Sequence, residues 1–386
     1  MATRTSIVSD LAPTQELKLR LLAEGMSVTA RAAKRLDDAV RELGWSAADY
    51  ASTSGLILRL EDDVWVNAPV RRNNPNFVRS DAVIKLDADS GGFVVDAGGS
   101  GSRAAYCPQA AYHGGAGGHG PLNNFVFTHA DRVRLSPLRS CAMVCEFCNI
   151  PYDDPIGTYA LKPIEGCLEA LDIALADQAQ PARHVLISGG TPKPKDVGFH
   201  RELFRRVLAH LPGVDVDIMM VPLRGVFDLG ELEAGGVHEL SINLEVYSRE
   251  RAKQVARHKF NQGLGLYLGF IDRAVARLGP GRVRSMLMVG LEPVEDTLAG
   301  VEELARRGAT PVLSPFRPDP ATPLRDVPPP TFAELAEVYS RAMEIARRHG
   351  VSLGPACPPC THNTLSFAQD SAGAVRYLYP GPVLVR

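Results

Sequence analysis

Apolar and polar positions follow two different rhythms along this chain, and the change falls near residue 131. From there to residue 348, short apolar runs alternate with longer segments whose apolar positions recur every three or four residues, as on one face of a helix. The strand-like runs are 133–138, 184–188, 214–221, 239–246, 282–290 and 311–316. Six such units in series predict an α/β fold, a parallel sheet closed into a full or partial TIM-like (β/α) barrel.

The first 130 residues have a different pattern. Residues 16–43 carry helical spacing, and short alternating runs within 56–69 and 81–99 predict strands joined by turns. The Gly-rich segment 96–121 is expected to form a long loop.

Three regions follow from these patterns. Residues 1–130 are expected to form a separate α+β region that caps the barrel or shapes its substrate pocket, and residues 131–330 the barrel. Residues 331–386 should form a helix and a cysteine-containing tail with a candidate auxiliary metal site.

Composition narrows the classes of function. The 386 residues are 45% hydrophobic and 22% charged, with a net charge of −2, so we do not expect a nucleic-acid or membrane partner. No apolar run approaches the roughly 20 residues of a membrane span, and the N-terminus lacks the order of a secretory signal. Seven unevenly spread cysteines fit a disulfide framework poorly and favour reduced thiols in a cytoplasmic protein.

Three of those cysteines, Cys141, Cys145 and Cys148, lie within eight positions in the spacing C-x3-C-x2-C. Four thiolates would fill a [4Fe–4S] cluster, so three leave one iron free to bind another molecule. They directly follow the first barrel strand, at the face where catalytic groups of this fold collect. The alternative is a zinc site completed by a distant histidine or cysteine.

The C-x3-C-x2-C spacing resembles the signature of the radical S-adenosylmethionine (radical SAM) superfamily. Phe147 matches the aromatic residue that precedes the third cysteine and lies against the adenine in that family. The resemblance implies a [4Fe–4S] cluster whose open iron binds SAM, which is cleaved reductively to methionine and a 5′-deoxyadenosyl radical.

The segment HVLISGGTP, residues 184–192, resembles the family's second-strand GGEP motif, whose backbone holds the SAM amino group. Gly189 and Gly190 permit close approach of backbone to a ligand. Thr191 replaces the usual glutamate. The alternative for the two glycines is an ordinary tight turn.

Two later segments resemble the biotin synthase-like subgroup. In ELSINLEV, Ser241, Asn243 and Glu245 share one face of the predicted strand, where the resemblance implies contacts to the SAM ribose and carboxylate. In SMLMVGLEPVEDT, Val289 and Gly290 match the segment beside the adenine. The alternative for the polar face is an internal hydrogen-bond network.

Three loop cysteines remain outside this pattern: Cys107, Cys357 and Cys360. The last two form a C-x2-C pair. One hypothesis is that all three bind a second Fe–S cluster, or a zinc ion with a histidine. The candidate histidines are His113, His119 and His362. The alternative is a pair of free thiols with Cys107 unrelated.

Together these residues predict a radical SAM enzyme that abstracts hydrogen from a small-molecule substrate and receives electrons from a donor such as flavodoxin or ferredoxin. Arg317 could meet an anionic group of that substrate, or lie on the surface, and Lys259 would close a basic helix. A peptide substrate, or a non-catalytic Fe–S or zinc scaffold, is the rival interpretation.

Overall fold

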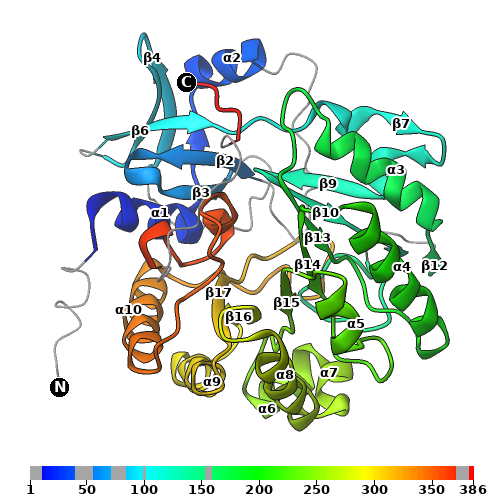
Figure 1. Ribbon diagram of the computed structural model, residues 1–386. Coiled ribbons are helices and arrows are strands. Elements are labelled where there is room, and N and C mark those ends of the chain that lie inside the picture. Colours follow the sequence, from blue (N-terminus) through cyan, green and yellow to red (C-terminus); the bar gives the residue numbers. More distant parts are fainter. Residues whose placement is uncertain (1–10, 40–54, 71–83, 99–100, 153–158, 371–381) are drawn as a thin grey trace.

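The computed structural model describes residues 11–39, 55–70, 84–98, 101–152, 159–370 and 382–386. This part of the chain is built on two main β-sheets, one formed by N-terminal strands and one by the predicted barrel strands (Figure 1). Helices line the outer side of the barrel sheet, and the N-terminal sheet lies beside it.

The barrel sheet has the order β17-β16-β15-β14-β13-β10-β9. The six strands from β10 to β17 are parallel, and β9 is antiparallel to β10. Because β17 and β9 remain edges, the sheet is a partial TIM-like barrel, which confirms the predicted fold class. Its strands are β9 (Val126–His129), β10 (Arg132–Leu135), β13 (His184–Ile187), β14 (Asp215–Met219), β15 (Glu239–Ser241), β16 (Val283–Val289) and β17 (Thr310–Pro315).

Every strand-like run predicted from residue 131 onward contains a strand, and helices follow in the predicted order. Each longer helix buries an apolar face; on α9 it consists of Leu298, Val301 and Leu304. The helices are α3 (Ile164–Leu175), α4 (Val197–His210), α5 (Leu229–Ala234), α6 (Arg249–Val255), α7 (Arg257–Gln262), α8 (Leu264–Leu278), α9 (Val294–Arg306) and α10 (Phe332–Arg348).

The N-terminal sheet has the order β1-β4-β5-β6-β2-β3 and packs with two helices. Its elements are α1 (Pro13–Glu24), β1 (Ser27–Val28), α2 (Ala30–Ala39), β2 (Gly55–Leu60), β3 (Trp65–Pro69), β4 (Lys85–Asp89), β5 (Gly92–Asp96) and β6 (Gly101–Tyr106). Four further short strands form two small antiparallel pairs: β7 (Ala116–Gly117) with β8 (Gly120–Pro121), and β11 (Leu138–Arg139) with β12 (Ala160–Leu161).

Two predictions for this region were wrong. The helical pattern from residue 16 is interrupted at Gly25, whose φ of 66° ends α1, and β1 follows before α2 begins. The predicted loop 96–121 contains β6, which pairs with β5 and β2. Strand β6 consists mainly of small residues next to glycines, so its sequence lacks a strand pattern. Pairing with β2 and β5 determines its conformation. The last residues of the predicted helix, 40–43, lie outside the described range.

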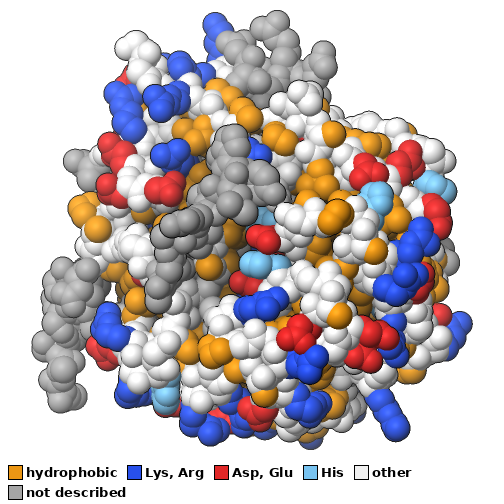
Figure 2. All heavy atoms as spheres, in the orientation of Figure 1, with side chains coloured by type: hydrophobic (Ala, Val, Ile, Leu, Met, Phe, Trp, Pro, Cys, Tyr) orange, Lys and Arg blue, Asp and Glu red, His pale blue; other side chains and the backbone are white. Residues whose placement is uncertain are grey.

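The two sheets share one core. Buried apolar residues form a continuous cluster from Leu17 in α1 to Phe367 in the C-terminal segment. Helix α10 packs against α1 and α9, and Val385 pairs with Tyr106 of β6. Among the described helices, none combines the length and apolar character that crossing a bilayer would require. Figure 2 shows basic and acidic side chains intermixed over one face, in keeping with the small net charge.

Candidate functional site

The cysteine loop lies where the first parallel strand of the barrel ends. Cys141, Cys145 and Cys148 follow β10 and the short β11, and the loop is sharply turned: Ser140 has a φ of 64° and Val144 a φ of 33°. Both values lie in or near the left-handed region that non-glycine residues rarely adopt. The loop thus gathers three thiols at the carboxyl edge of the sheet, the face predicted from the sequence.

The backbone of the second-strand motif, residues 184–192, holds the cysteine loop in place. The Thr191 N–H donates to Cys141 Sγ at 3.2 Å, and the Ala142 N–H donates to the Thr191 carbonyl at 3.0 Å. The Met143 N–H also donates to Cys141 Sγ, at 3.4 Å. Thr191 therefore acts through its peptide groups, and N–H donors to sulfur are a feature of Fe–S ligation.

Gly189 and Gly190 let the chain that follows β10 pass close to the end of β13. Their φ values are 92° and 115°, and a Cβ at Gly190 would lie 2.5 Å from the Ser140 carbonyl oxygen. A Cβ at Gly189 would lie 2.4 Å from Ser136 Oγ. The cysteine loop thus approaches Gly190, and the residue that follows β10 approaches Gly189.

The three thiols suit a cluster better than a single ion. In the described chain they form no group whose ligand atoms all lie within 4.8 Å of one another. A tetrahedral zinc ion with bonds of about 2.3 Å needs its sulfurs closer than that, whereas a cubane binds each thiolate at a different iron. Burial raises the pKa of Cys145 to about 12, opposed by Lys259, so thiolates here need the positive charge that iron supplies.

On the fourth strand, Ser241 and Asn243 bond to each other and to the sheet. Ser241 Oγ donates to Asn243 Oδ1 at 2.8 Å, and the same oxygen accepts from the Met286 N–H at 3.1 Å. These two side chains are therefore occupied by an internal network, the alternative considered from the sequence.

Glu245 differs from them. Its φ is 68°, and a bridge to Leu287 of β16 fixes its backbone. Lys259 Nζ lies 3.3 Å from Glu245 Oε1 and donates to the Asn243 carbonyl at 2.9 Å. Glu245 Oε2 is buried without a hydrogen-bond partner in the described structure. Lys259 is thus buried beside the cysteine loop, and it lies in the last turn of α7, in keeping with the expectation that it closes a basic helix.

A cavity of about 150 Å³ runs through the interior of the barrel from this carboxylate. Phe147 and Cys148 line one end, and Cys360 and Arg132 line it as well. Methionines 219, 286 and 288 supply much of its apolar wall. Val289, by contrast, is in the core, and a Cβ at Gly290 would meet the Pro330 ring at 2.9 Å.

Arg317 also lines this cavity. From the sequence, this side chain could either meet a substrate or lie on the surface. The side chain is buried, and its guanidinium donates to the Asn67 carbonyl of β3 at 2.7 Å. Burial lowers the pKa of Arg317 to about 10. The contact brings the N-terminal sheet against the cavity.

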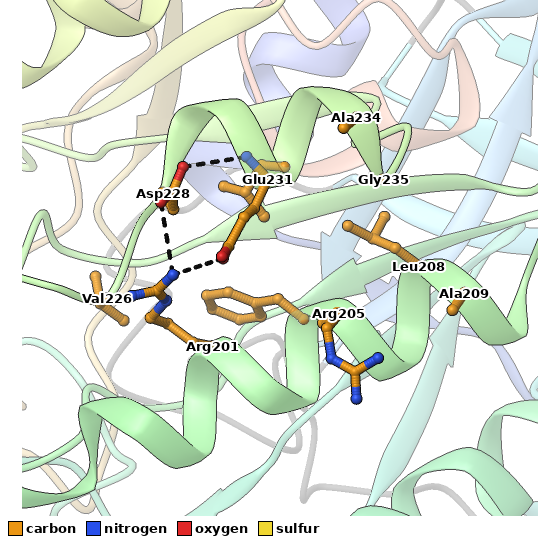
Figure 3. Close-up of a pocket in the computed structure, with 11 residues that line it drawn as sticks. Arg201, Arg205, Leu208, Ala209, Val226, Asp228, Glu231, Ala234 and Gly235 are labelled. Carbon is orange, nitrogen blue, oxygen red and sulfur yellow. Dashed lines mark hydrogen bonds and ion pairs between the residues drawn. The ribbon is translucent and has the colours of Figure 1, made fainter.

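A larger cavity, of about 310 Å³, lies between α4 and α5 on the outer side of the barrel (Figure 3). Its charged groups form ion pairs: Arg201 lies 2.7 Å from Glu231 and 3.5 Å from Asp228, and Arg205 pairs with Glu202. None of its lining residues belongs to the cysteine loop or to a strand. Its larger size alone therefore does not make it the functional site.

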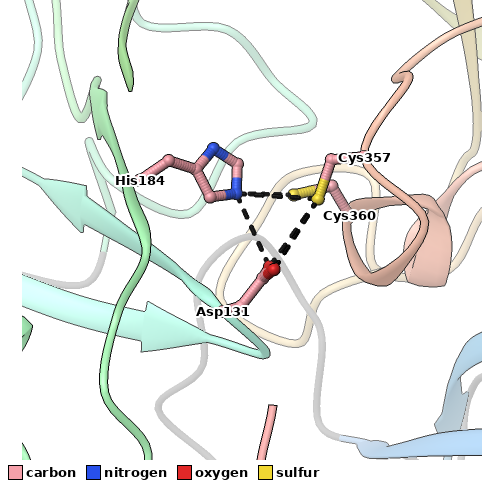
Figure 4. Close-up of side chains that lie close together, drawn as sticks. All are labelled: Asp131, His184, Cys357 and Cys360. Atoms are coloured by element: carbon pink, nitrogen blue, oxygen red, sulfur yellow. Dashed lines mark hydrogen bonds and ion pairs between the residues drawn. The ribbon is translucent and has the colours of Figure 1, made fainter. Parts of the chain in front are cut away.

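A second group of potential ligands lies at the opposite end of the strands. Asp131, His184, Cys357 and Cys360, which we call the basal group, have ligand atoms that all lie within 4.8 Å of one another (Figure 4). Burial would raise the pKa of Cys360, but a hydrogen bond from Cys357 and the charges of Arg132 and His184 lower it to about 5. The sequence missed Asp131 and His184, whose only signal is a polar residue at the start of an apolar strand.

The other predicted partners of the C-x2-C pair lie elsewhere. Cys107 Sγ accepts a hydrogen bond from Gln180 at 2.9 Å and is outside the basal group. His362 Nδ1 donates to the Pro359 carbonyl at 2.7 Å. His113 Nε2 accepts from the Thr128 N–H at 3.2 Å. His119 also stands apart, with its Cβ beside Gly166 of α3.

One further polar cluster, Asp217, His238 and Glu239, lies at the base of the central strands. Arg284 forms ion pairs with both carboxylates, at 2.9 Å to Asp217. His238 Nδ1 bonds to Asp217 at 2.9 Å. Arg284 and His238, whose pKa the hydrogen bond to Asp217 raises, together balance the two carboxylates, so the cluster needs no metal ion.

Comparisons with known proteins find partial similarities. No family model matches the chain. Over 123 residues it is 29% identical to the bacteriochlorophyllide c C-7(1)-hydroxylase of Chlorobaculum limnaeum, an alignment that covers 31% of each protein. The chain therefore spans about a third of that relative.

Three solved structures match parts of the chain at low identity. The FeFe-hydrogenase maturase HydG of Carboxydothermus hydrogenoformans is 16% identical, with a TM-score of 0.43 over 57% of this chain and 52% of that one. A radical SAM methyltransferase of Sphaerobacter thermophilus is 15% identical, with a TM-score of 0.42 over 70% and 75% of the two chains. The radical SAM enzyme HemN of Escherichia coli is 16% identical, with a TM-score of 0.36 over 48% and 46%.

Proposed function

We propose that this chain, a radical SAM enzyme by its cysteine triad and partial barrel, acts on a small anionic molecule held in the barrel cavity. One observation carries the proposal: the cysteine loop and the unpartnered oxygen of Glu245 meet at the same end of that cavity. A metal scaffold would have no need for a strained carboxylate beside its ligands.

The cysteine triad would hold a [4Fe–4S] cluster that, when reduced and bound to SAM, supplies a 5′-deoxyadenosyl radical able to abstract hydrogen from an unactivated C–H bond. This chain's own part is to place the cluster and keep solvent from it. The Thr191 and Met143 N–H groups fix Cys141, and Cys145 is only 7% exposed.

Glu245 would bind and orient SAM. Lys259 fixes one carboxylate oxygen, so the other is left as a preset acceptor for hydroxyl or ammonium groups. Phe147, which lines the cavity next to Cys148, offers an aromatic face for the adenine. Phe147 precedes the ligand Cys148 in the chain, and Glu245 lines the cavity with it. Both residues are therefore placed to orient SAM at the cluster, as a reactive radical requires.

Substrate would occupy the rest of the cavity. The methionines that line it adapt their shape to an apolar ligand, which suits a small molecule. Arg317 and Arg132 line the same space, so an anionic group such as a carboxylate is favoured. Electrons would come from a donor such as flavodoxin or ferredoxin.

The decisive experiment is anaerobic reconstitution of the full chain with iron and sulfide, followed by dithionite and SAM. We expect 5′-deoxyadenosine to form, and to be lost in Cys148→Ala. Cys167→Ala is the matched control, because Cys167 is a fully buried thiol of α3 far from the loop in sequence. Zinc bound by the triad with no SAM cleavage would instead identify a scaffold protein.

A further inference from the structure

The basal group lies where three separate parts of the chain meet. Asp131 is in the turn between β9 and β10, and His184 is the first residue of β13. Arg132 and His184 are partners in the parallel register, and the Arg183 N–H donates to the Asp131 carbonyl at 2.7 Å. The barrel itself therefore places the carboxylate and the imidazole side by side.

The two thiols come from the C-terminal segment, which is anchored to β17 at the edge of the barrel sheet. The Gly354 N–H donates to the Pro311 carbonyl and the Leu365 N–H to the Leu313 carbonyl, each at 2.9 Å. Between these anchors, Cys357 precedes the short helix η7 (Pro359–Asn363), and Cys360 lies within it. A C-x2-C turn of this kind is a frequent source of two metal ligands.

Four of the six distances within the group match the edges of a single tetrahedron, and the other two are below 4.8 Å. Cys357 Sγ lies 3.6 Å from His184 Nε2 and 3.7 Å from Asp131 Oδ1. Cys360 Sγ lies 3.3 Å from His184 Nε2, which lies 3.5 Å from Asp131 Oδ1. Around a zinc ion with ordinary bond lengths, sulfur–nitrogen and sulfur–oxygen edges are about 3.6 Å and a nitrogen–oxygen edge about 3.4 Å.

Burial strengthens the case for a cation. Asp131 is 1% exposed and Cys360 is 2% exposed, so a carboxylate and a thiolate face each other away from water. Such groups are costly unless a positive charge compensates them. His184 and Arg132 supply part of this positive charge, and Arg284 is already engaged by Asp217 and Glu239. A bound cation would complete the compensation.

We infer that Asp131, His184, Cys357 and Cys360 bind one zinc ion, which fastens the C-terminal segment to the base of the barrel. Two sulfurs, one nitrogen and one oxygen form a closed set of four protein ligands, which is typical of structural rather than catalytic zinc. The ligand atoms converge on one point, unlike the wider cysteine triad, and so favour a single ion over an Fe–S cluster.

The test is a metal analysis of the full chain, purified anaerobically without added metal and assayed for zinc, iron and sulfide. We expect about one zinc per chain, kept in Cys148→Ala and Cys167→Ala and lost in Cys357→Ser/Cys360→Ser. The near-isosteric Asp131→Asn should bind zinc roughly tenfold more weakly while folding normally. Zinc content is measured independently of SAM cleavage. The test of the basal group can therefore fail or succeed separately from the test of the cysteine triad.

Cobalt gives a second readout on the unaltered chain. Co²⁺ in place of zinc should show the visible bands of a tetrahedral ion and a thiolate-to-cobalt charge-transfer band, with cobalt taken up at one equivalent. Iron and sulfide that disappear in the Cys357→Ser/Cys360→Ser variant would overturn the assignment in favour of a second cluster. A metal-free chain with a Cys357–Cys360 disulfide would overturn it in favour of a redox pair.

Discussion

Glu245 combines a strained backbone, a buried ion pair and one unpartnered oxygen. Such strain persists only where the surrounding structure enforces it, and it clusters at functional sites. Burial alone would lower the pKa of Lys259, but the charges of Glu245, Tyr267 and Cys145 together raise it. The lysine therefore stays charged and keeps the carboxylate in one orientation.

From this arrangement we predict that Glu245→Gln weakens SAM binding by roughly 10- to 100-fold, since a hydrogen bond to a charged group contributes about 1.5–3 kcal/mol. The reconstituted chain should be titrated with SAM by calorimetry. Glu250→Gln, at an exposed position in the first turn of α6, is the control and should leave the dissociation constant unchanged. An equally unchanged value for Glu245→Gln would remove this residue from the SAM site.

Gly190 is the second residue on which the cysteine loop depends. Alanine there would place a methyl group against the Ser140 carbonyl, in a conformation that L-residues rarely adopt. We predict that Gly190→Ala lowers cluster iron by roughly threefold or more, because the loop must shift. Gly198→Ala, at an open position of α4, should retain full iron content. Similar iron in the two variants, measured after identical reconstitution, would contradict this role.

At the scale of elements, α1 is joined to the C-terminal segment through a fully buried lysine. Lys18 Nζ donates to the Thr361 carbonyl at 2.9 Å and the Ser366 carbonyl at 2.6 Å, and lies 4.8 Å from the centre of the Phe367 ring. Burial lowers the pKa of Lys18 to about 7, and the charge of Asp370 only partly opposes this.

This pKa sets the sign of a stability profile. Between pH 7 and about 10.4 the unfolded chain keeps the Lys18 proton and the folded chain does not, so stability rises with pH. Relative to Lys18→Met, the wild type should gain up to about 2.7 kcal/mol of unfolding free energy from pH 7 to pH 9. Denaturant titrations at both pH values measure it. Lys34 is an exposed lysine of α2, so Lys34→Met should leave the wild-type slope of unfolding free energy against pH unchanged. Equal slopes for all three chains would refute the lowered pKa of Lys18.

The order of elements from residue 131 onward could be predicted because each one carries its own pattern. The six strand runs and their helices are long and periodic, and all appear. Strand β6, by contrast, is short and made of small residues, and only its pairing with β2 and β5 defines it. Local pattern thus predicts amphipathic elements well and misses those held by neighbours.

The same distinction applies to the sites. The spacing of Cys141, Cys145 and Cys148 is local, so it is visible in the sequence. Asp131 and His184 are separated from Cys357 by more than 170 positions, and only the parallel register of β10 and β13 brings them to it. Asp131 belongs to no recognised motif, and His184 only begins the segment that resembles the GGEP motif, so the completed ligand set appears only in three dimensions.

In the whole molecule, the cysteine triad and the basal group lie at opposite ends of the strands, with one cavity between them. The C-terminal segment closes this space from below. It contacts β17, α1 and the N-terminal sheet, so it joins the barrel to the region before residue 130. A zinc ion on the basal group would therefore affect how the two sheets are held together.

We predict that removing zinc makes residues 351–370 the first site of proteolysis in the folded chain. Without the ion, two thiols and a carboxylate lose their common ligand, and local opening of this segment becomes easier. Limited proteolysis with mass spectrometry should show cleavage there at least tenfold faster after a zinc-selective chelator, with triad iron retained. Cys357→Ser/Cys360→Ser should be cleaved at that faster rate already, chelator or not. Cleavage that starts in the N-terminal sheet, or is indifferent to the chelator, would mean that packing alone holds the segment.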